Sequence, residues 1–469
     1  MTAEQVISFN SLHLPSFRSI CRPPPSIPLT STTKRKLLEG DTKKRPGPPP
    51  EPTLSTVDMR FMPCAFASFL ALRGGQLGLA AATPPRNGSI ANSPPEPRPD
   101  GKITPKIMIV SMFAPEAQVW YDNMPPSSHG NLLAVNITIP GLSPRYPHVH
   151  CREDLQVCQV TTCEGEINAA SSAMALLLSP KFNLTKTYFL LAGIAGANPK
   201  YSTIGGVALA RYTVQVALQY EFDAREMPDN FTTGYVAYGT TQPEEYPKIL
   251  YGTEVFEVSN ALRDAAFNYA VRANLSDNED SKKYRARYKP EGKIFAKASS
   301  GPEVVKCDTV TSDVYYSGTL LSEAFERTTG VWTNGTGRYC MTAQEDNAVL
   351  GSLVRMAVYG VVDFSRVVVM RTGSNFDRPP PNVTAYEHLL VLKQNGFEVA
   401  IQNLYLAGIE IVNGILKDWG AVFDKGIKPC NYIGDVLGSL GGEPDFGPGS
   451  ETKGVGFRPP GNSTTRAIV

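Results

Sequence analysis

The sequence predicts an α/β fold: a three-layer sandwich in which helices cover both faces of a mixed central sheet. Short apolar, β-rich runs alternate along the chain with helical patterns of about 10–15 residues, as expected for strands flanked by helices. The chain has 469 residues, of which 42% are hydrophobic, so it can bury one large core or two ordinary ones.

The predicted elements follow one another at short intervals. We expect strands over residues 106–113, 131–139, 155–162, 188–192, 212–222 and 366–371. We expect helices over residues 164–178, 259–273, 346–364, 386–395 and 400–417. These elements predict one domain over residues 104–445, with a linker over 83–103 before it and a flexible Gly/Pro-rich tail over 446–469 behind it.

The most informative stretch is the apolar run from Tyr188 to Ala192 and the glycine-rich segment behind it. We expect Gly193, Ile194 and Gly196 to form a tight loop at the end of a buried strand. Glycines let backbone N–H groups approach a ligand, and ligands usually bind at strand ends in α/β sheets. A tight packed turn is the other interpretation of this loop, and the residues alone leave both open.

The first hundred residues differ in composition from the rest. Residues 1–58 are rich in Pro, Ser, Thr, Lys and Arg, so we expect them to be disordered, as an extension added by the gene model. Residues 59–82 begin with Met59, a positive charge and an apolar stretch, which predicts a signal peptide. An internal apolar helix behind a disordered tail is the alternative. With the signal peptide, the mature protein is expected in the secretory pathway, extracellular or in the cell envelope.

Sequons agree with secretion, because the chain holds more of them than the roughly three that chance predicts. We predict N-glycosylation at Asn87, Asn136, Asn183, Asn230, Asn274, Asn334, Asn382 and Asn462.

The cysteines behind the signal peptide are even in number, which suggests disulfides in a secreted chain. We expect the pairs Cys151–Cys158 and Cys307–Cys340, although spacing alone does not fix the connectivity. The stretch His148–Cys151 is the nearest match to a zinc site, but it fits no known ligand spacing well. We therefore predict no metal and no cofactor.

Charge and hydropathy limit the classes of partner that the chain is expected to have. The formal net charge is +1, and no basic stripe is interleaved with aromatics, which argues against a nucleic-acid partner. A membrane-spanning helix needs about 20 mostly apolar residues, and charged residues interrupt the longest apolar runs. We therefore expect no membrane span.

Polar residues stand at three places where a strand ends or a helix begins. Glu116 follows the first predicted strand, and Glu345 and Asp346 begin a predicted helix. Ser374 and Asn375 follow the strand that ends at residue 371. Side chains at such positions are well placed to meet a ligand.

In this order, the segments resemble the nucleoside phosphorylase superfamily, including its nucleosidases. The closer resemblance is to the fungal purine nucleoside permease family, over roughly residues 106–437. It rests on MFAPEAQVW, TTCEGEINAA, LAGIAGANPKYSTIGGVALARYTVQVALQYEFD, CMTAQEDNAVL and RTGSNFDRP. The resemblance implies a nucleoside phosphorylase-like fold and purine nucleosides as ligands.

The resemblance also implies roles for single residues. Asp346, with Glu345 beside it, would hold the ribose hydroxyls, although an acidic first turn also stabilises a helix by itself. Asn375 stands beside Ser374 where nucleosidases have an acid; it can hydrogen-bond the purine but cannot protonate it. Glu116 would position the attacking water.

Other positions bear on the choice of nucleophile and on the base. Ile194 stands where phosphorolytic relatives often have a phosphate-binding serine, which disfavours phosphorolysis. Arg371 or Arg211 would supply an anion contact, or else make ordinary surface pairs. Trp332 or Tyr339 would stack on the purine, or else pack in the core.

Two functions remain open at this point. One is a secreted protein that binds purine nucleosides and cleaves their N-glycosidic bond, with hydrolysis favoured over phosphorolysis. The other is a non-enzymatic component of nucleoside uptake, as the family name implies, acting by binding or with a membrane partner. A homo-oligomer is compatible with both.

Overall fold

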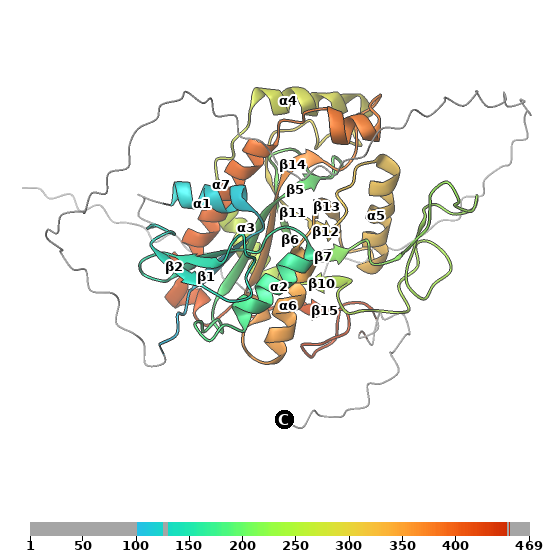
Figure 1. Ribbon diagram of the computed structural model, residues 1–469. Coiled ribbons are helices and arrows are strands. Elements are labelled where there is room, and N and C mark those ends of the chain that lie inside the picture. Colours follow the sequence, from blue (N-terminus) through green and yellow to red (C-terminus); the bar gives the residue numbers. More distant parts are fainter. Residues whose placement is uncertain (1–100, 125–129, 448–449, 451–469) are drawn as a thin grey trace, which may run out of the picture. The chain divides into compact units, whose positions relative to one another are not determined.

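A mixed sheet of 13 strands organises residues 101–124, 130–447 and 450, which are the residues that the computed structural model describes (Figure 1). The strand order is β15-β10-β7-β12-β13-β5-β1-β4-β3-β2; β14 pairs with β5 and β6, and β6 also pairs with β11. In chain order these strands are β1 (Ile107–Ser111), β2 (Val135–Thr138), β3 (His148–Cys151), β4 (Val157–Thr161), β5 (Tyr188–Ala197), β6 (Val207–Ala210), β7 (Tyr212–Gln215), β10 (Val255–Glu257), β11 (Val304–Lys306), β12 (Asp308–Thr311), β13 (Tyr339–Ala343), β14 (Val367–Phe376) and β15 (Gly434–Asp435).

The middle of the sheet is parallel and apolar. β1 runs parallel to both β4 and β5, and β14 runs parallel to β5. Every residue of β1 is buried, as is nearly all of β5, so these strands are continuous apolar runs rather than alternating ones. That pattern is expected when helices cover both faces of a parallel sheet.

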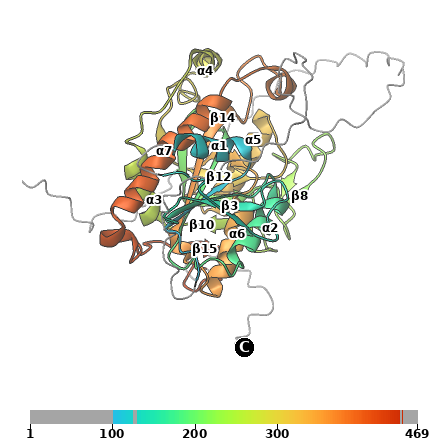
Figure 2. The ribbon, with the colours of Figure 1, turned by 60° about the vertical axis from the view of Figure 1, so that its left-hand side comes forward.

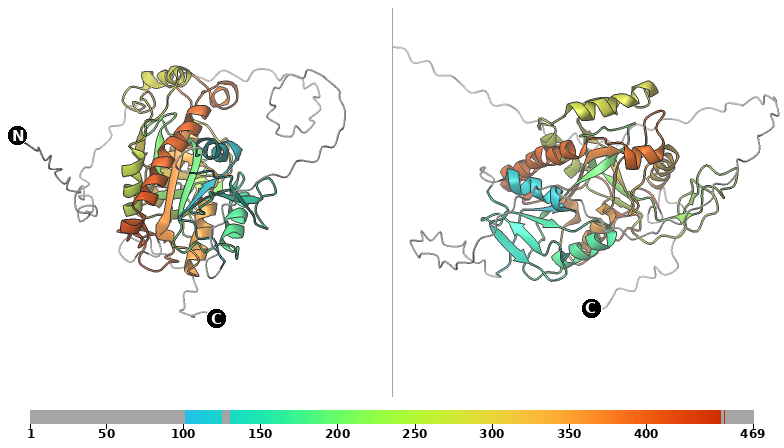
Figure 3. Two further views of the ribbon diagram at one scale, coloured as in Figure 1. Left: turned by 90° about the vertical axis from the view of Figure 1, so that its left-hand side faces the viewer. Right: turned by 45° about the horizontal axis from the view of Figure 1, so that its top comes forward.

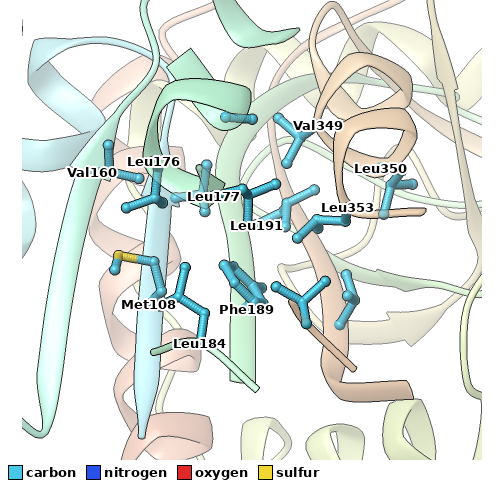
Figure 4. Close-up of a cluster of buried hydrophobic side chains, with 14 of the residues drawn as sticks. Met108, Val160, Leu176, Leu177, Leu184, Phe189, Leu191, Val349, Leu350 and Leu353 are labelled. Atoms are coloured by element: carbon cyan, nitrogen blue, oxygen red, sulfur yellow. The ribbon is translucent and has the colours of Figure 1, made fainter. Parts of the chain in front are cut away.

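Helices cover the two faces. On one face lie α1 (Ala114–Asn123), α3 (Asn260–Ala270) and α7 (Phe397–Lys417), and on the other lie α2 (Glu166–Leu177) and α6 (Asp346–Val358) (Figure 2). Figure 3 shows the sheet between these layers. Leu176 of α2 and Leu353 of α6 meet Met108 and Leu191 of the sheet in one of the two largest core clusters (Figure 4).

Further helices cover the rest of the sheet. α5 (Thr319–Trp332) buries Phe325 and Trp332 against strands β12 and β13, in a cluster with Tyr339. α4 (Glu279–Arg285) and the following 3-10 turn (Ala286–Glu291) bury Tyr284 and Tyr288 over the ends of β5 and β14. Two short strands, β8 (Tyr220–Glu221) and β9 (Tyr235–Val236), pair separately from the main sheet.

The predicted fold class, an α/β three-layer sandwich with a mixed sheet, is confirmed. The expected loop at residues 193–196 is wrong: β5 continues through it to Ala197, because β14 and β13 hydrogen-bond to it on both sides. The expected strand 212–222 is split, and the expected helix 346–364 ends at Val358. The expected helix 386–395 is a short π turn, Glu387–Val391. α1, α4, α5, β12 and β13 were not predicted.

The domain boundaries are slightly wider than expected. Ile103, placed in the linker, bridges to Phe182, and Phe446, placed in the tail, is buried against Tyr212. Residues 1–58, the predicted signal peptide over 59–82, most of the predicted linker and most of the predicted tail lie outside the described residues, as do Asn87 and Asn462.

One helix corrects the expectation that no apolar segment is long enough to span a membrane. Within the described part of the chain, α7 is the single helix that is long and apolar enough to cross a membrane. In its most apolar stretch of 18 residues, 61% is buried inside the protein. Ala400, Leu404, Ala407 and Ile411 recur at helical spacing and face the core. α7 therefore packs here as a core helix of the fold.

Both predicted disulfides are present: Cys151–Cys158 joins neighbouring strands, and Cys307–Cys340 links β13 to the residue before β12. The first removes Cys151 as a metal ligand. No group of three or more His, Cys, Asp or Glu residues that could hold a metal occurs among the described residues.

Candidate functional site

A cavity of about 320 Å³ opens where β1, β5 and β14 end. The carboxyl ends of these parallel strands converge there, as do the segments that follow β12 and β13. The predicted site residues Glu116, Ile194, Gly196 and Glu345 line it, together with Ser374 and Asn375. The other lining residues are Met112, Phe113, Glu164, Ala195, Ser312, Val314, Tyr315, Tyr316, Thr342, Ala343, Gln344, Arg371 and Phe397.

Glu116 lies in the first turn of α1, directly behind β1, and is 1% exposed. Its Oε2 accepts a hydrogen bond from the Met112 N–H at 2.7 Å, and its Oε1 accepts one from the Ile194 N–H at 2.7 Å. Burial raises the pKa of this carboxyl to about 8, although the nearby Arg371 guanidinium acts in the opposite direction. The group is therefore mostly neutral at pH 7.

Arg371 of β14 is the centre of a buried ion-pair network. Its Nε lies 3.1 Å from Asp346 Oδ1, its Nη2 donates to Asp346 and to Glu345 Oε2, and its Nη1 donates to the carbonyl oxygen of Ile194 at 3.1 Å. The expectation that Arg371 makes an ordinary surface pair is wrong, because its side chain is 2% exposed. Arg211 does pair with carboxylates, those of Glu257 and Asp445, and does not line the cavity.

The two acidic residues at the start of α6 occupy different positions. Glu345 lines the cavity, and its Oε1 accepts a hydrogen bond from the Gly165 N–H at 3.1 Å. Burial raises the pKa of the Glu345 carboxyl. Asp346 is fully buried behind it against Arg371 and does not line the cavity. A ligand hydroxyl would therefore meet Glu345 first.

The glycines of β5 make room for the site. A Cβ at Gly193 would lie 2.8 Å from Glu116 Oε1 and 3.0 Å from Arg371 Cζ. A Cβ at Gly196 would lie 2.6 Å from Thr342 Oγ1 and 3.3 Å from Asn375 Nδ2. Neither glycine has a positive φ, so both are needed for close approach of side chains rather than for a turn.

Asn375 and Ser374 lie at a register shift in the pairing of β14 with β5. Ser374 Oγ donates to the carbonyl oxygen of Ala195 at 3.1 Å and lies 2.8 Å from Asn375 Oδ1. Thr342 Oγ1 accepts the Gly196 N–H at 3.0 Å. These polar groups also line the cavity, so they provide neutral hydrogen-bonding partners beside its carboxylates.

Aromatic residues form the mouth, and sequence reasoning missed them. Phe113 and Phe397 pack edge to face with ring centroids 6.2 Å apart, and Tyr315 is 62% exposed. Trp332, at the end of α5, and Tyr339, at the start of β13, were expected to stack on the base but pack in the core and do not line the cavity. Tyr315 and Tyr316 follow the β-rich run 308–311, and that position at a strand end was the available signal.

The chain matches the family model described as purine nucleoside permease over residues 104–428. A purine nucleoside permease from Candida albicans is 45% identical over 356 residues, which are 75% of this chain and 85% of the relative.

Several solved structures are similar to this one at low sequence identity, 14% or less. They include a 5′-methylthioadenosine/S-adenosylhomocysteine nucleosidase from Neisseria meningitidis (TM-score 0.38, 13% identity, 67% of this chain and 99% of that one). A futalosine hydrolase of Helicobacter pylori is similar at a TM-score of 0.39 and 12% identity, over 67% of this chain and 98% of that one. By its sequence, this chain belongs to the purine nucleoside permease family.

Proposed function

We propose that the cavity binds purine nucleosides and that the protein hydrolyses their N-glycosidic bond. The observation that carries the proposal is the meeting of Glu116, Glu345 and Asn375, from three different elements, around one cavity. Its volume of about 320 Å³ is at the lower end of the range of small-molecule sites. Family membership supports the purine nucleoside as ligand.

Each part of a nucleoside has a matching wall. The carboxylate of Glu345 can accept hydrogen bonds from the two ribose hydroxyls, because a vicinal diol presents two donors. The amide of Asn375 can hydrogen-bond the purine, and the aromatic rings of Phe113, Tyr315 and Phe397 offer apolar faces for the base. A nucleoside bound in this way would have its C1′ between the base contacts and the carboxylates.

The proposed step is displacement of the base by water. The water oxygen forms a bond to C1′, the C1′–N bond breaks, and its electron pair leaves with the purine. The Glu116 carboxylate takes the proton of the water, and the departing purine takes a proton from solvent, since the Asn375 amide has none to give. Positive charge that develops on the ribose is stabilised by Glu116 and Glu345.

Phosphate is a poor alternative nucleophile for this cavity. Ile194 offers no hydroxyl to a phosphate, and the buried Glu116 and Glu345 make the lining acidic. We therefore favour hydrolysis over phosphorolysis.

Secretion and glycosylation complete the proposal. The two disulfides are typical of an oxidising compartment. Of the six described sequon asparagines, Asn183 is half-buried, and the side chains exposed to solvent are those of Asn136, Asn230, Asn274, Asn334 and Asn382. N-terminal sequencing of the natural protein tests the signal peptide; a mature start near Met1 contradicts it.

The experiment is incubation of the purified protein with adenosine or guanosine, with and without inorganic phosphate, followed by chromatography of the free base. We expect base release without phosphate, loss of release in Glu116→Gln, and normal release in Glu153→Gln, an exposed glutamate outside the cavity. Saturable binding with no base released would favour the second candidate, a non-enzymatic uptake component, which the family name supports. Release only with phosphate would overturn hydrolysis.

A further inference from the structure

We infer that Asp346 is a specificity-determining residue that prevents the cavity from accepting phosphate, either free or as a substituent of a ligand. Asp346 acts through Arg371 and touches no ligand itself, so it is a positioning residue. That water rather than phosphate is the nucleophile rests on the proposed function. That the cavity binds phosphate weakly does not rest on it.

Arg371 is the residue that would attract phosphate. Among the described residues that line the cavity, it alone has a cationic side chain. Arginine binds phosphate well because its planar fork presents several N–H donors to the oxygens. A cavity at the ends of parallel strands with one buried arginine would therefore be expected to bind anions.

The hydrogen bonds of Arg371 are already committed. Its Nε and Nη2 both donate to Asp346, its Nη2 also donates to Glu345 Oε2 at 3.3 Å, and its Nη1 donates to the carbonyl oxygen of Ile194. One N–H of Nη1 has no acceptor among these contacts. The fork that would bind phosphate is occupied by Asp346.

Asp346 is the fixed counterion of this arginine, and Glu345 is not. Asp346 is 0% exposed and does not line the cavity, so no ligand can compete for it. It also lies in the first turn of α6, where the helix dipole stabilises a negative charge. Glu345 lines the cavity, so a ligand can reach its carboxylate. Its Oε1 is held in place by the Gly165 N–H.

The test is titration of the intact protein with inorganic phosphate, followed by ³¹P NMR or calorimetry, in wild type and in Asp346→Asn. Asparagine keeps the shape and removes the charge. We expect negligible binding by the wild type and about 10- to 100-fold tighter binding by the variant, the range of one freed charge-assisted contact. If the proposed hydrolysis holds, the variant should also form ribose 1-phosphate.

Two controls identify the cause. Asp346→Asn combined with Arg371→Gln should lose the gained affinity, and Glu164→Gln, an equal charge change on an exposed residue at the mouth, should not produce it. Equal gains in Glu164→Gln and Asp346→Asn, or no gain in an Asp346→Asn protein that melts like wild type, would overturn the inference.

If Asp346→Asn does not fold, the wild-type protein alone still tests the inference. Phosphate binding by the wild type in the low millimolar range contradicts the inference, and no binding in that range supports it. Failure of the proposed function looks different: neither protein would bind nucleoside, while the phosphate affinities would still differ.

Discussion

Gly193→Ala tests whether the glycines of β5 serve the site. A Cβ there would lie 2.8 Å from Glu116 Oε1, and ordinary contact begins near 3.4 Å, so the carboxylate must retreat by about 0.6 Å. Arg371 Cζ, at 3.0 Å, must retreat as well, although its guanidinium is held by Asp346 and by the carbonyl oxygen of Ile194. Overpacking of this kind costs about 1–3 kcal/mol.

The assay combines urea unfolding with calorimetric titration by adenosine. We expect Gly193→Ala to unfold more easily by that amount and to bind adenosine at least about 10-fold more weakly, since about 1.4 kcal/mol corresponds to a factor of ten. The matched control is Gly330→Ala inside α5, where a Cβ meets nothing within 4 Å. That variant should be about 0.5–1 kcal/mol more stable. A Gly193→Ala protein with the stability and affinity of the wild type would refute the reasoning.

Three further predictions concern single side chains. Base release should rise with pH through about 8, as Glu116 ionises. The same raised pKa means that the contribution of Glu116 to stability is full below about pH 4.5 and is lost as the pH rises through 8; Glu116→Gln should abolish release and remove this pH dependence of stability. Glu345→Gln should weaken adenosine binding by about 10-fold or more with little effect on adenine, measured by calorimetry, because the ribose contact is lost. Asn375→Asp should speed base release below neutral pH, because a carboxylic acid can protonate the departing purine; an unchanged rate would argue against Asn375 at the base.

Much of the fold and part of the site follow from local sequence. Strands and helices with clear periodicity were predicted, and Glu116, Glu345 and Asn375 were singled out because they follow predicted strands or begin a predicted helix. These positions are local features of the chain, so neighbouring residues are enough to identify them.

The rest depended on contacts between distant segments. The strand β5 was expected to end at Gly193, because glycine is usually a breaker, yet β14 pairs with Gly193 and β13 pairs with Gly196 further on. Burial of Arg371 follows from its pairing with Asp346, 25 residues earlier in the chain, and no local pattern shows that. Tyr315 at the mouth and Trp332 in the core are both aromatic, and only the packing of α5 distinguishes them.

The most direct test of the account is calorimetric titration of the wild-type protein with adenosine and with 2′,3′-dideoxyadenosine. If the ribose hydroxyls bind Glu345 in this cavity, adenosine should bind saturably at one site per chain, and the dideoxy compound should bind at least about 10-fold more weakly. No saturable binding of adenosine, guanosine or inosine, or equal affinity for the two titrants, would contradict the account.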